Sequence, residues 1–168
     1  MTTLYLVRHG ETVDNLNQIM QGQRPGRLNE RGVEQAEAVA MRMENVKIDA
    51  FVSSDLKRSF DTCSIIARPH GMDVRTTPLL RERDWGSFTG CFIPGLKDKP
   101  WPDDIETLDE LKTRAKAFID FIRNEYPEKV VLAVGHGIIN KAIQSVFYNK
   151  PMNEVQRMEN AEVRTLMI

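Results

Sequence analysis

The chain has only two cysteines among its 168 residues, Cys63 and Cys91, and neither lies in a CxxC pair or a Cys/His cluster. The sequence therefore argues against a disulfide framework and a zinc site, and it favours a reducing compartment. Long apolar runs are also missing, and so is the basic and apolar start of a signal peptide. A cytoplasmic location without a membrane partner is the expectation.

An excess of charge of one sign is missing too, because 23 Lys and Arg residues face 24 Asp and Glu residues and the net charge is −1. Nothing in this balance predicts a nucleic-acid partner, so any anion binding must be local. The hydrophobic share of 41% is ordinary for a globular protein, and 168 residues can bury a full core. We expect one domain over residues 1–168, whereas the oligomeric state has no signal in the sequence.

Short apolar runs of the strand type alternate with helical patterns along the chain. The runs cover residues 4–7, 50–53, 74–77, 130–134 and 163–168. Apolar residues at helical spacing predict four helices, which start at Asn29, after Ser54 or Asp55, near Thr107 and at Gly137. This alternation predicts a layered α/β fold.

Two of the three histidines occupy the same setting. His9 and His136 each follow a strand-type run and precede a glycine, Gly10 and Gly137. Ligands of open α/β sheets bind beyond the carboxyl ends of parallel strands. If the two strands are neighbours, the imidazoles face one another across one pocket, and the glycines let the backbone approach a ligand closely. His70, within a Pro-His-Gly sequence, is expected to be a turn residue.

Arginines accompany these histidines. Arg8 directly precedes His9, and Arg58 lies early in the helix expected after the second strand. The guanidinium fork matches carboxylate or phosphate oxygens, and it would repel the cation of a metal site built on the two histidines. The residues therefore favour a phosphoryl group bound among helix N-termini. Pairing of Arg58 with Asp55 or Asp61 on its own helix is the alternative.

A site of this composition can transfer a phosphoryl group, because neutral imidazole is a competent nucleophile toward phosphorus and arginines neutralise the equatorial oxygens. The leaving alkoxide then needs a proton donor, and spacing alone does not choose among the carboxylates. Arg81 and Arg83 flank one of them, Glu82, and favour its ionised form, so a bound anionic phosphate would have to compensate. The candidate donors are Glu11, Asp14, Glu82 and Asp84.

Four ordered blocks of the sequence carry a family resemblance. They are Leu6-Val7-Arg8-His9-Gly10-Glu11-Thr12, Ser53-Ser54-Asp55-Leu56-Lys57-Arg58-Ser59, Leu80-Arg81-Glu82 with Gly86, and Val134-Gly135-His136-Gly137. Together with Asn15 and Gln21-Gly22 after the first block, they resemble the signature of the histidine phosphatase superfamily, which includes the cofactor-dependent phosphoglycerate mutases. The match covers essentially the whole chain.

The resemblance implies a three-layer αβα fold with a central, mostly parallel sheet of the phosphoglycerate mutase type. It also implies that His9 is the phosphorylated nucleophile and that Glu82 is the proton donor, and no metal or organic cofactor is required in this family. The catalytic residues that it implies are His9, Glu82, His136, Arg8 and Arg58. The substrate-binding residues that it implies are Arg8, Asn15, Gln21, Gly22, Arg58 and Gly137.

The sequence departs from the family pattern after the proton-donor block. Thr89 stands before Gly90, where the family often has an acidic residue, and the segment that follows is shorter than the insertion that caps the site in the mutases. Residues 90–104 have no clear period and hold several prolines, which predicts an exposed loop. A mutase must keep water away from a bisphosphorylated intermediate, so a short, open rim favours hydrolysis.

The expected activity is that of a metal-independent phosphomonoesterase, which acts on a small phosphorylated metabolite through a phosphohistidine. A mutase-type phosphotransferase and a non-catalytic phospholigand-binding module are the alternatives. Arg24 and Arg27 lie in a loop that would border the pocket, where they are either solvated or in contact with a second anionic group of the substrate. The identity of the phosphate ester has no signal in the sequence.

Overall fold

The computed structural model describes residues 1–168 and contains a five-stranded sheet with the strand order β3-β2-β4-β1-β5. The first four strands are parallel, whereas β5 pairs antiparallel with β1 at one edge of the sheet. Each of the five apolar runs therefore forms a strand, as predicted. The strands are β1 (Thr3–Arg8), β2 (Ala50–Ser53), β3 (Val74–Thr76), β4 (Val130–Gly135) and β5 (Val163–Met167).

The α-helices are α1 (Val13–Leu16), α2 (Glu30–Met43), α3 (Lys57–Ala67), α4 (Leu108–Glu125) and α5 (Gly137–Tyr148). The side chains of Asn29 and Thr107 accept backbone N–H groups at the starts of α2 and α4, which confirms both predicted starts. The helix α3 begins slightly later than predicted, because the Ser54 hydroxyl accepts the N–H of Leu56 in the turn that precedes the helix.

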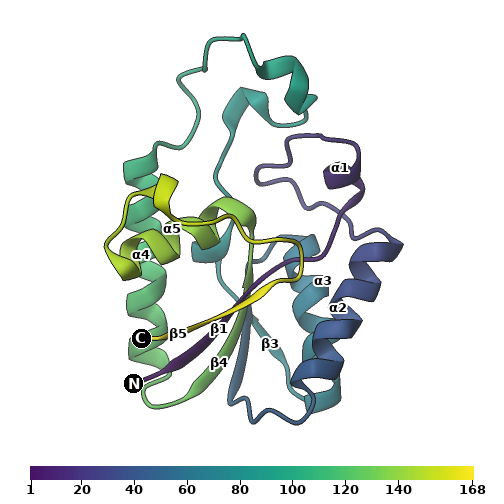
Figure 1. Ribbon diagram of the computed structural model, residues 1–168, viewed down its shortest axis with the longest axis vertical. Helices are drawn as coiled ribbons and strands as arrows, with labels where there is room; N and C mark the ends of the chain where they lie inside the picture. Colours follow the sequence, from purple (N-terminus) through teal and green to yellow (C-terminus); the bar gives the residue numbers. More distant parts are fainter.

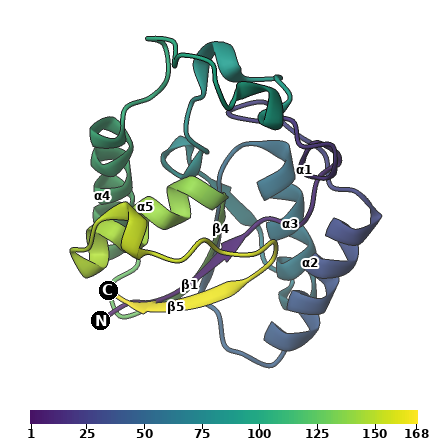
Figure 2. The ribbon, with the colours of Figure 1, turned by 45° about the horizontal axis from the view of Figure 1, so that its top comes forward.

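The helices cover both faces of the sheet. Helices α2 and α3 lie on one face and α4 and α5 on the other, with β1 and β4 at the centre (Figure 1, Figure 2). Because side chains alternate along a strand, Leu4 and Leu6 of β1 pack into a core of 17 buried residues with α4 and α5. Val7 packs into a second core of 11 buried residues with α2 and α3. The fold is thus the three-layer αβα arrangement with a mostly parallel sheet that the resemblance implies.

Two loops lie above the carboxyl ends of the strands and form the upper part of the molecule in Figure 1. The first loop covers residues 9–29 and includes α1, and the second covers residues 77–107. An isolated antiparallel bridge joins Ile19 in the first loop to Phe92 in the second. In the second loop, the ring centroids of Trp85 and Trp101 lie 5.4 Å apart in an edge-on contact. Most of residues 90–104 are exposed, as predicted, but these contacts hold the segment over the strand ends. No helix of the chain combines the length and the apolar character needed to cross a membrane.

Candidate active site

The parallel pairing of β1 with β4 brings the two strand-end histidines together. Arg8 lies opposite Gly135 in the register, so His9 and His136 follow at the same edge of the sheet. Their ring centroids are 5.1 Å apart, their planes are inclined by 64°, and both residues are buried. The two imidazoles therefore lie side by side, as the sequence predicts for neighbouring strands.

One ring nitrogen of His9 forms a hydrogen bond within the protein. Its Nδ1 lies 2.6 Å from the carbonyl oxygen of Gly10, and because a carbonyl only accepts, Nδ1 carries the hydrogen. Burial and the charges of Arg58 and Arg8 lower the pKa of His9 well below its ordinary value, so the ring is neutral near pH 7. Nε2 therefore keeps its lone pair, as a nucleophile requires.

In His136 the hydrogen-bonded nitrogen is Nε2 rather than Nδ1, and its partner is Ser54. The Ser54 hydroxyl oxygen accepts the N–H of Leu56 and lies 2.7 Å from Nε2 of His136. The hydroxyl has no other acceptor within the protein, so we assign its hydrogen to the bond with Nε2. With Nε2 accepting, the hydrogen of the neutral ring sits on Nδ1, which is buried without a partner in the protein. Burial lowers the pKa of His136 well below its usual value, so the ring is neutral at pH 7.

Arg8 and Arg58 add two buried positive charges beside the histidines. Arg8 donates from Nη1 to the carbonyl of Met158 at 2.8 Å, and Arg58 donates from Nη2 to the carbonyl of Gly22 at 2.8 Å. Neither guanidinium has a carboxylate within 4.0 Å, and the Nε–H of each is buried without a partner. Burial lowers the pKa of Arg58 to about 10, which leaves it charged at neutral pH.

The alternative in which Arg58 pairs with an acid of its own helix is wrong. Asp55 instead receives both hydrogen bonds of Arg81, at 2.7 and 2.6 Å, and Asp61 pairs with Lys57 at 2.7 Å. The reason is geometric, because Arg58 points inward under the loop after Gly22, whereas both aspartates face the surface side of the segment. Arg58 therefore has no carboxylate partner, and its positive charge faces the pocket that it lines.

Glu82 is fixed at the first turn of α5. Its carboxylate oxygens accept the backbone N–H groups of Ile138, Ile139 and Arg83, at distances between 2.9 and 3.2 Å. The flanking arginines point elsewhere, since Arg81 pairs with an aspartate and Arg83 donates to the carbonyl of Glu106. The helix N-terminus thus holds this carboxylate in place.

Of the four candidate proton donors, Glu82 is the one that lines the pocket of His9. Glu11 accepts from the side chain of Asn29, and Asp14 lies 4.0 Å from Arg24. Asp84 accepts the N–H of Gly86 in a turn outside the pocket. Glu82 is thus the candidate carboxylate that the structure brings to the pocket.

The pocket has a volume of about 200 Å³, and several predicted binding residues line it. Asn15 and Gln21 direct their side-chain oxygens to hydrogen bonds within the protein, which leaves their amide N–H groups for a ligand. Gly137 does not line the pocket itself but lies behind the lining residue Arg8, whose Nε is 3.4 Å from the place of a β-carbon on that glycine. The predicted residues in the lining are Arg8, His9, Asn15, Gln21, Gly22, Arg58 and Glu82.

One expectation about this region needs correction. A β-carbon on Gly10 would lie 2.5 Å from the carbonyl oxygen of Gly32, so Gly10 permits close packing of the turn after β1 on α2 rather than close approach to a ligand. The loop after Gly22 borders the pocket, but its two arginines are exposed, which is the solvated alternative. Arg27 lines a separate cavity with Asp61 and Arg68, and Arg24 lies opposite Asp14.

The sequence carries no signal for Arg157 or for the aliphatic lining of the pocket, whereas Trp85 is an aromatic residue that either walls the site or packs in the core. Arg157 comes from the loop before β5, which carries no recognisable motif, and only its composition could have drawn attention to it. Trp85 both lines the pocket and packs against Trp101. The other apolar lining residues are Ile19, Met20, Ile93 and Ile138.

A neutral imidazole with a free lone pair, unpaired N–H donors and two buried arginines define an α/β protein whose site can bind and transfer a phosphoryl group. The chain offers no group of three or more His, Cys, Asp or Glu side chains suited to a metal ion. The model of the histidine phosphatase superfamily (branch 1) matches residues 4–168. The chain belongs to this superfamily.

Relatives with different functional names share most of this chain. A protein named "Uncharacterized phosphatase PhoE" from Bacillus subtilis (strain 168) is 34% identical over 166 residues, which cover 96% of this chain and 86% of the relative. "Probable phosphoglycerate mutase GpmB" from Yersinia pestis (strain Pestoides F) is 32% identical, with 94% and 80% covered. Relatives of this chain thus carry both phosphatase and mutase names.

Solved structures agree with the fold. The mycobacterial glucosyl-3-phosphoglycerate phosphatase in complex with VO3 superposes with a TM-score of 0.91 at 27% identity, covering 98% of this chain and 92% of that one. Bacillus stearothermophilus YhfR superposes with a TM-score of 0.88 at 28% identity, covering 100% and 92%. Both cover the sheet, the helices and the loops above the strand ends.

Proposed function

We propose that this chain is a phosphomonoesterase that hydrolyses a small phosphorylated metabolite through a phosphohistidine at His9, without a metal ion. One observation carries the proposal. Four buried side-chain polar atoms lack a hydrogen-bond partner, and three of them are Arg8 Nε, Arg58 Nε and His136 Nδ1. Buried donors rarely stay unpaired, and three N–H groups beside one nucleophile suit the three equatorial oxygens of a transferring phosphoryl group.

In the first step, Nε2 of His9 attacks the phosphorus while the bond to the ester oxygen breaks. The leaving alkoxide takes a proton from the Glu82 carboxyl group. The unpaired N–H groups of Arg8, Arg58 and His136 stabilise the charge on the equatorial oxygens. The products of this step are the free alcohol, phosphorylated His9 and the Glu82 carboxylate.

In the second step, the Glu82 carboxylate takes a proton from water, and the water oxygen attacks the phosphorus. The bond between phosphorus and Nε2 breaks, inorganic phosphate leaves, and His9 returns to its neutral form. Glu82 is again protonated, so the cycle closes without a further reagent. The contacts of Glu82 with the first turn of α5 keep it at one place through both steps.

Hydrolysis is favoured over mutase activity by the segment above the pocket. Of residues 90–104, only Ile93 lines the pocket, and most of the segment is exposed. A mutase has to exclude water while its bisphosphorylated intermediate turns over, and this segment offers little cover for that. Transfer of label between 2- and 3-phosphoglycerate faster than release of free phosphate would instead support the mutase alternative.

Hydrolysis of p-nitrophenyl phosphate in excess EDTA tests the proposal. The wild type should release nitrophenol, and His9→Gln should lower the rate by at least ~10³-fold, because it removes the nucleophile. His70→Gln makes the same change at a histidine that contacts Phe51 outside the site, and it should keep the rate. Full activity of His9→Gln, or activity that depends on added divalent metal, would contradict the mechanism.

A further inference from the structure

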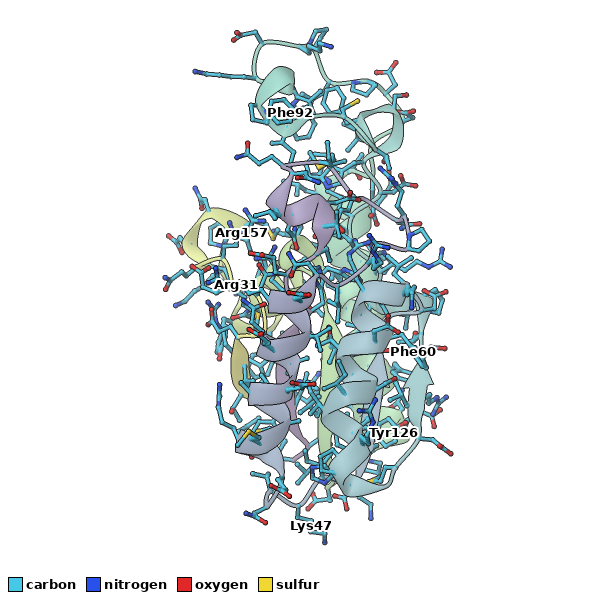
Figure 3. The ribbon with its side chains drawn as sticks, turned by 90° about the vertical axis from the view of Figure 1, so that its right-hand side faces the viewer. Arg31, Lys47, Phe60, Phe92, Tyr126 and Arg157 are labelled. Atoms are coloured by element: carbon cyan, nitrogen blue, oxygen red, sulfur yellow. The ribbon has the colours of Figure 1, made fainter.

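Arg157 is a guanidinium in the pocket that the proposed chemistry does not use. It lines the pocket of His9 and also an adjoining outer cavity that it shares with Arg8 and Asn15. No carboxylate lies within 4.0 Å of it, and its side chain makes no hydrogen bond within the protein. Figure 3 shows it in the loop before β5, beside the first loop above the sheet. A free guanidinium in a ligand pocket is a group ready to bind an anion.

The backbone on both sides of Arg157 is held firmly, although its side chain is free. Arg164 of β5 donates to the carbonyls of Gln156 and Arg157, at 2.7 and 3.3 Å. Arg8 donates to the carbonyl of Met158 at 2.8 Å, and the Met158 side chain is buried. The loop therefore presents the Arg157 guanidinium from a fixed base, which lowers the entropy cost of binding.

The position of Arg157 relative to Arg8 points to a second anionic group. The Nε atoms of Arg8 and Arg157 lie 3.4 and 3.7 Å from the place of a β-carbon on Gly137, so both side chains lie against the same side of that glycine. Burial and, after it, the charge of Arg157 lower the pKa of Arg8, so the two cations are close enough to repel one another. Arg8 is buried beside the nucleophile, whereas Arg157 is exposed toward the rim, where the rest of a substrate would lie.

We infer that Arg157 forms a second anion subsite, so that the substrate is a phosphate monoester bearing another anionic group, either a carboxylate or a second phosphate. This inference rests on the proposed phosphatase function. Glu11 and Glu159 line the outer cavity and repel an anion there, which directs the second group to the inner side of Arg157. The apolar residues Ile19, Trp85 and Ile93 also line the pocket and suit the carbon body of the ester.

Three esters with the same three-carbon chain test the subsite: 3-hydroxypropyl phosphate, 3-(phosphonooxy)propanoate and propane-1,3-diyl bisphosphate. The wild type should show a kcat/KM at least roughly tenfold higher for one or both anionic esters, as expected for one charge-assisted contact. Arg157→Gln should remove that preference while changing kcat/KM for the hydroxyl ester less than about threefold. A preference for 3-(phosphonooxy)propanoate indicates a carboxylate subsite, and a preference for the bisphosphate indicates a phosphate subsite.

Arg123→Gln is the matched control, since Arg123 is an exposed residue in the last turn of α4 and lines none of these cavities. It should leave all three values unchanged. An equal loss for all three esters in Arg157→Gln would place Arg157 on the transferring phosphoryl group and overturn the inference. An absence of preference in the wild type would overturn it as well.

Binding measurements separate this inference from the proposed function. Titration calorimetry of His9→Ala with the three esters reads the subsite without turnover, and the anionic esters should bind more tightly only when Arg157 is present. A wild type that hydrolyses none of the esters contradicts the phosphatase proposal, and the titration still decides the subsite. Equal affinities with and without the Arg157 guanidinium would contradict the subsite alone.

Discussion

At the scale of single residues, hydrogen bonds at the ring nitrogens give two chemically identical side chains different capacities. His9 donates from Nδ1 to a carbonyl and keeps a lone pair on Nε2. His136 accepts from Ser54 at Nε2 and keeps an N–H at Nδ1. One ring can therefore attack phosphorus while the other donates to its oxygens. Ser54, which the sequence offers only as part of a motif block, makes the difference.

Removal of the Ser54 hydroxyl tests this tautomer argument. Ser54→Ala should lower kcat by roughly ten- to a hundredfold, because His136 is then free to carry its hydrogen on either nitrogen. The ¹⁵N chemical shifts of His136 should move from those of the Nδ1–H tautomer toward a mixture of both. Stopped assays with p-nitrophenyl phosphate and NMR of the labelled protein provide the two readouts.

Ser53→Ala is the control for that change, since the Ser53 hydroxyl donates to the Ser54 carbonyl and does not contact His136. This variant should lose some stability but keep the His136 shifts. Unchanged His136 shifts in Ser54→Ala would show that the hydroxyl does not set the tautomer.

At the scale of elements, the regular structure followed from periodicity, while the loops did not. Strands and long helices repeat apolar residues at spacings that a single sequence displays, and caps such as Asn29 mark their starts. The helix α1 has only four residues and buries none of them, so it has no period to detect. The segment 90–104 is held by contacts distant in sequence, as between Ile19 and Phe92, and no local pattern announces these.

The residues of the candidate site also divide into those that local sequence patterns predict and those that depend on distant contacts. His9, Arg8 and His136 stand directly at strand ends, and the order of the strands suffices to bring them together. The inward direction of Arg58 depends on where the chain folds over it, and the sequence alone allowed a helix-surface pairing instead. Arg157 enters the pocket only because the loop before β5 is pinned by Arg164 and Arg8, which no motif encodes.

At the scale of the whole molecule, the buried neutral histidines link stability to pH. Burial lowers the pKa of both His9 and His136, so the folded protein leaves them neutral while the unfolded chain protonates them below about pH 6.5. The stability that comes from keeping the two rings neutral is fully present above that pH, and it is lost as the pH falls toward their pKa values in the folded state. In that range, each histidine should lower the free energy of unfolding by up to about 1.4 kcal/mol for every pH unit of acidification.

Urea unfolding between pH 6.5 and pH 5 measures that slope. The His9→Gln, His136→Gln double variant should lose less stability than the wild type over this interval, because neither glutamine titrates. Equal slopes for the two proteins would show that the histidines are not held neutral in the folded state.

Trapping of the phosphorylated protein shows whether His9 carries the phosphoryl group during turnover. Wild type mixed with p-nitrophenyl phosphate and quenched in alkali should gain the mass of one phosphoryl group, and peptide mapping should locate this group on His9. His136→Ala should gain it more slowly, and His9→Ala should not gain it at all. A phosphoryl group on another residue, or one that persists in His9→Ala, would contradict a phosphohistidine at His9.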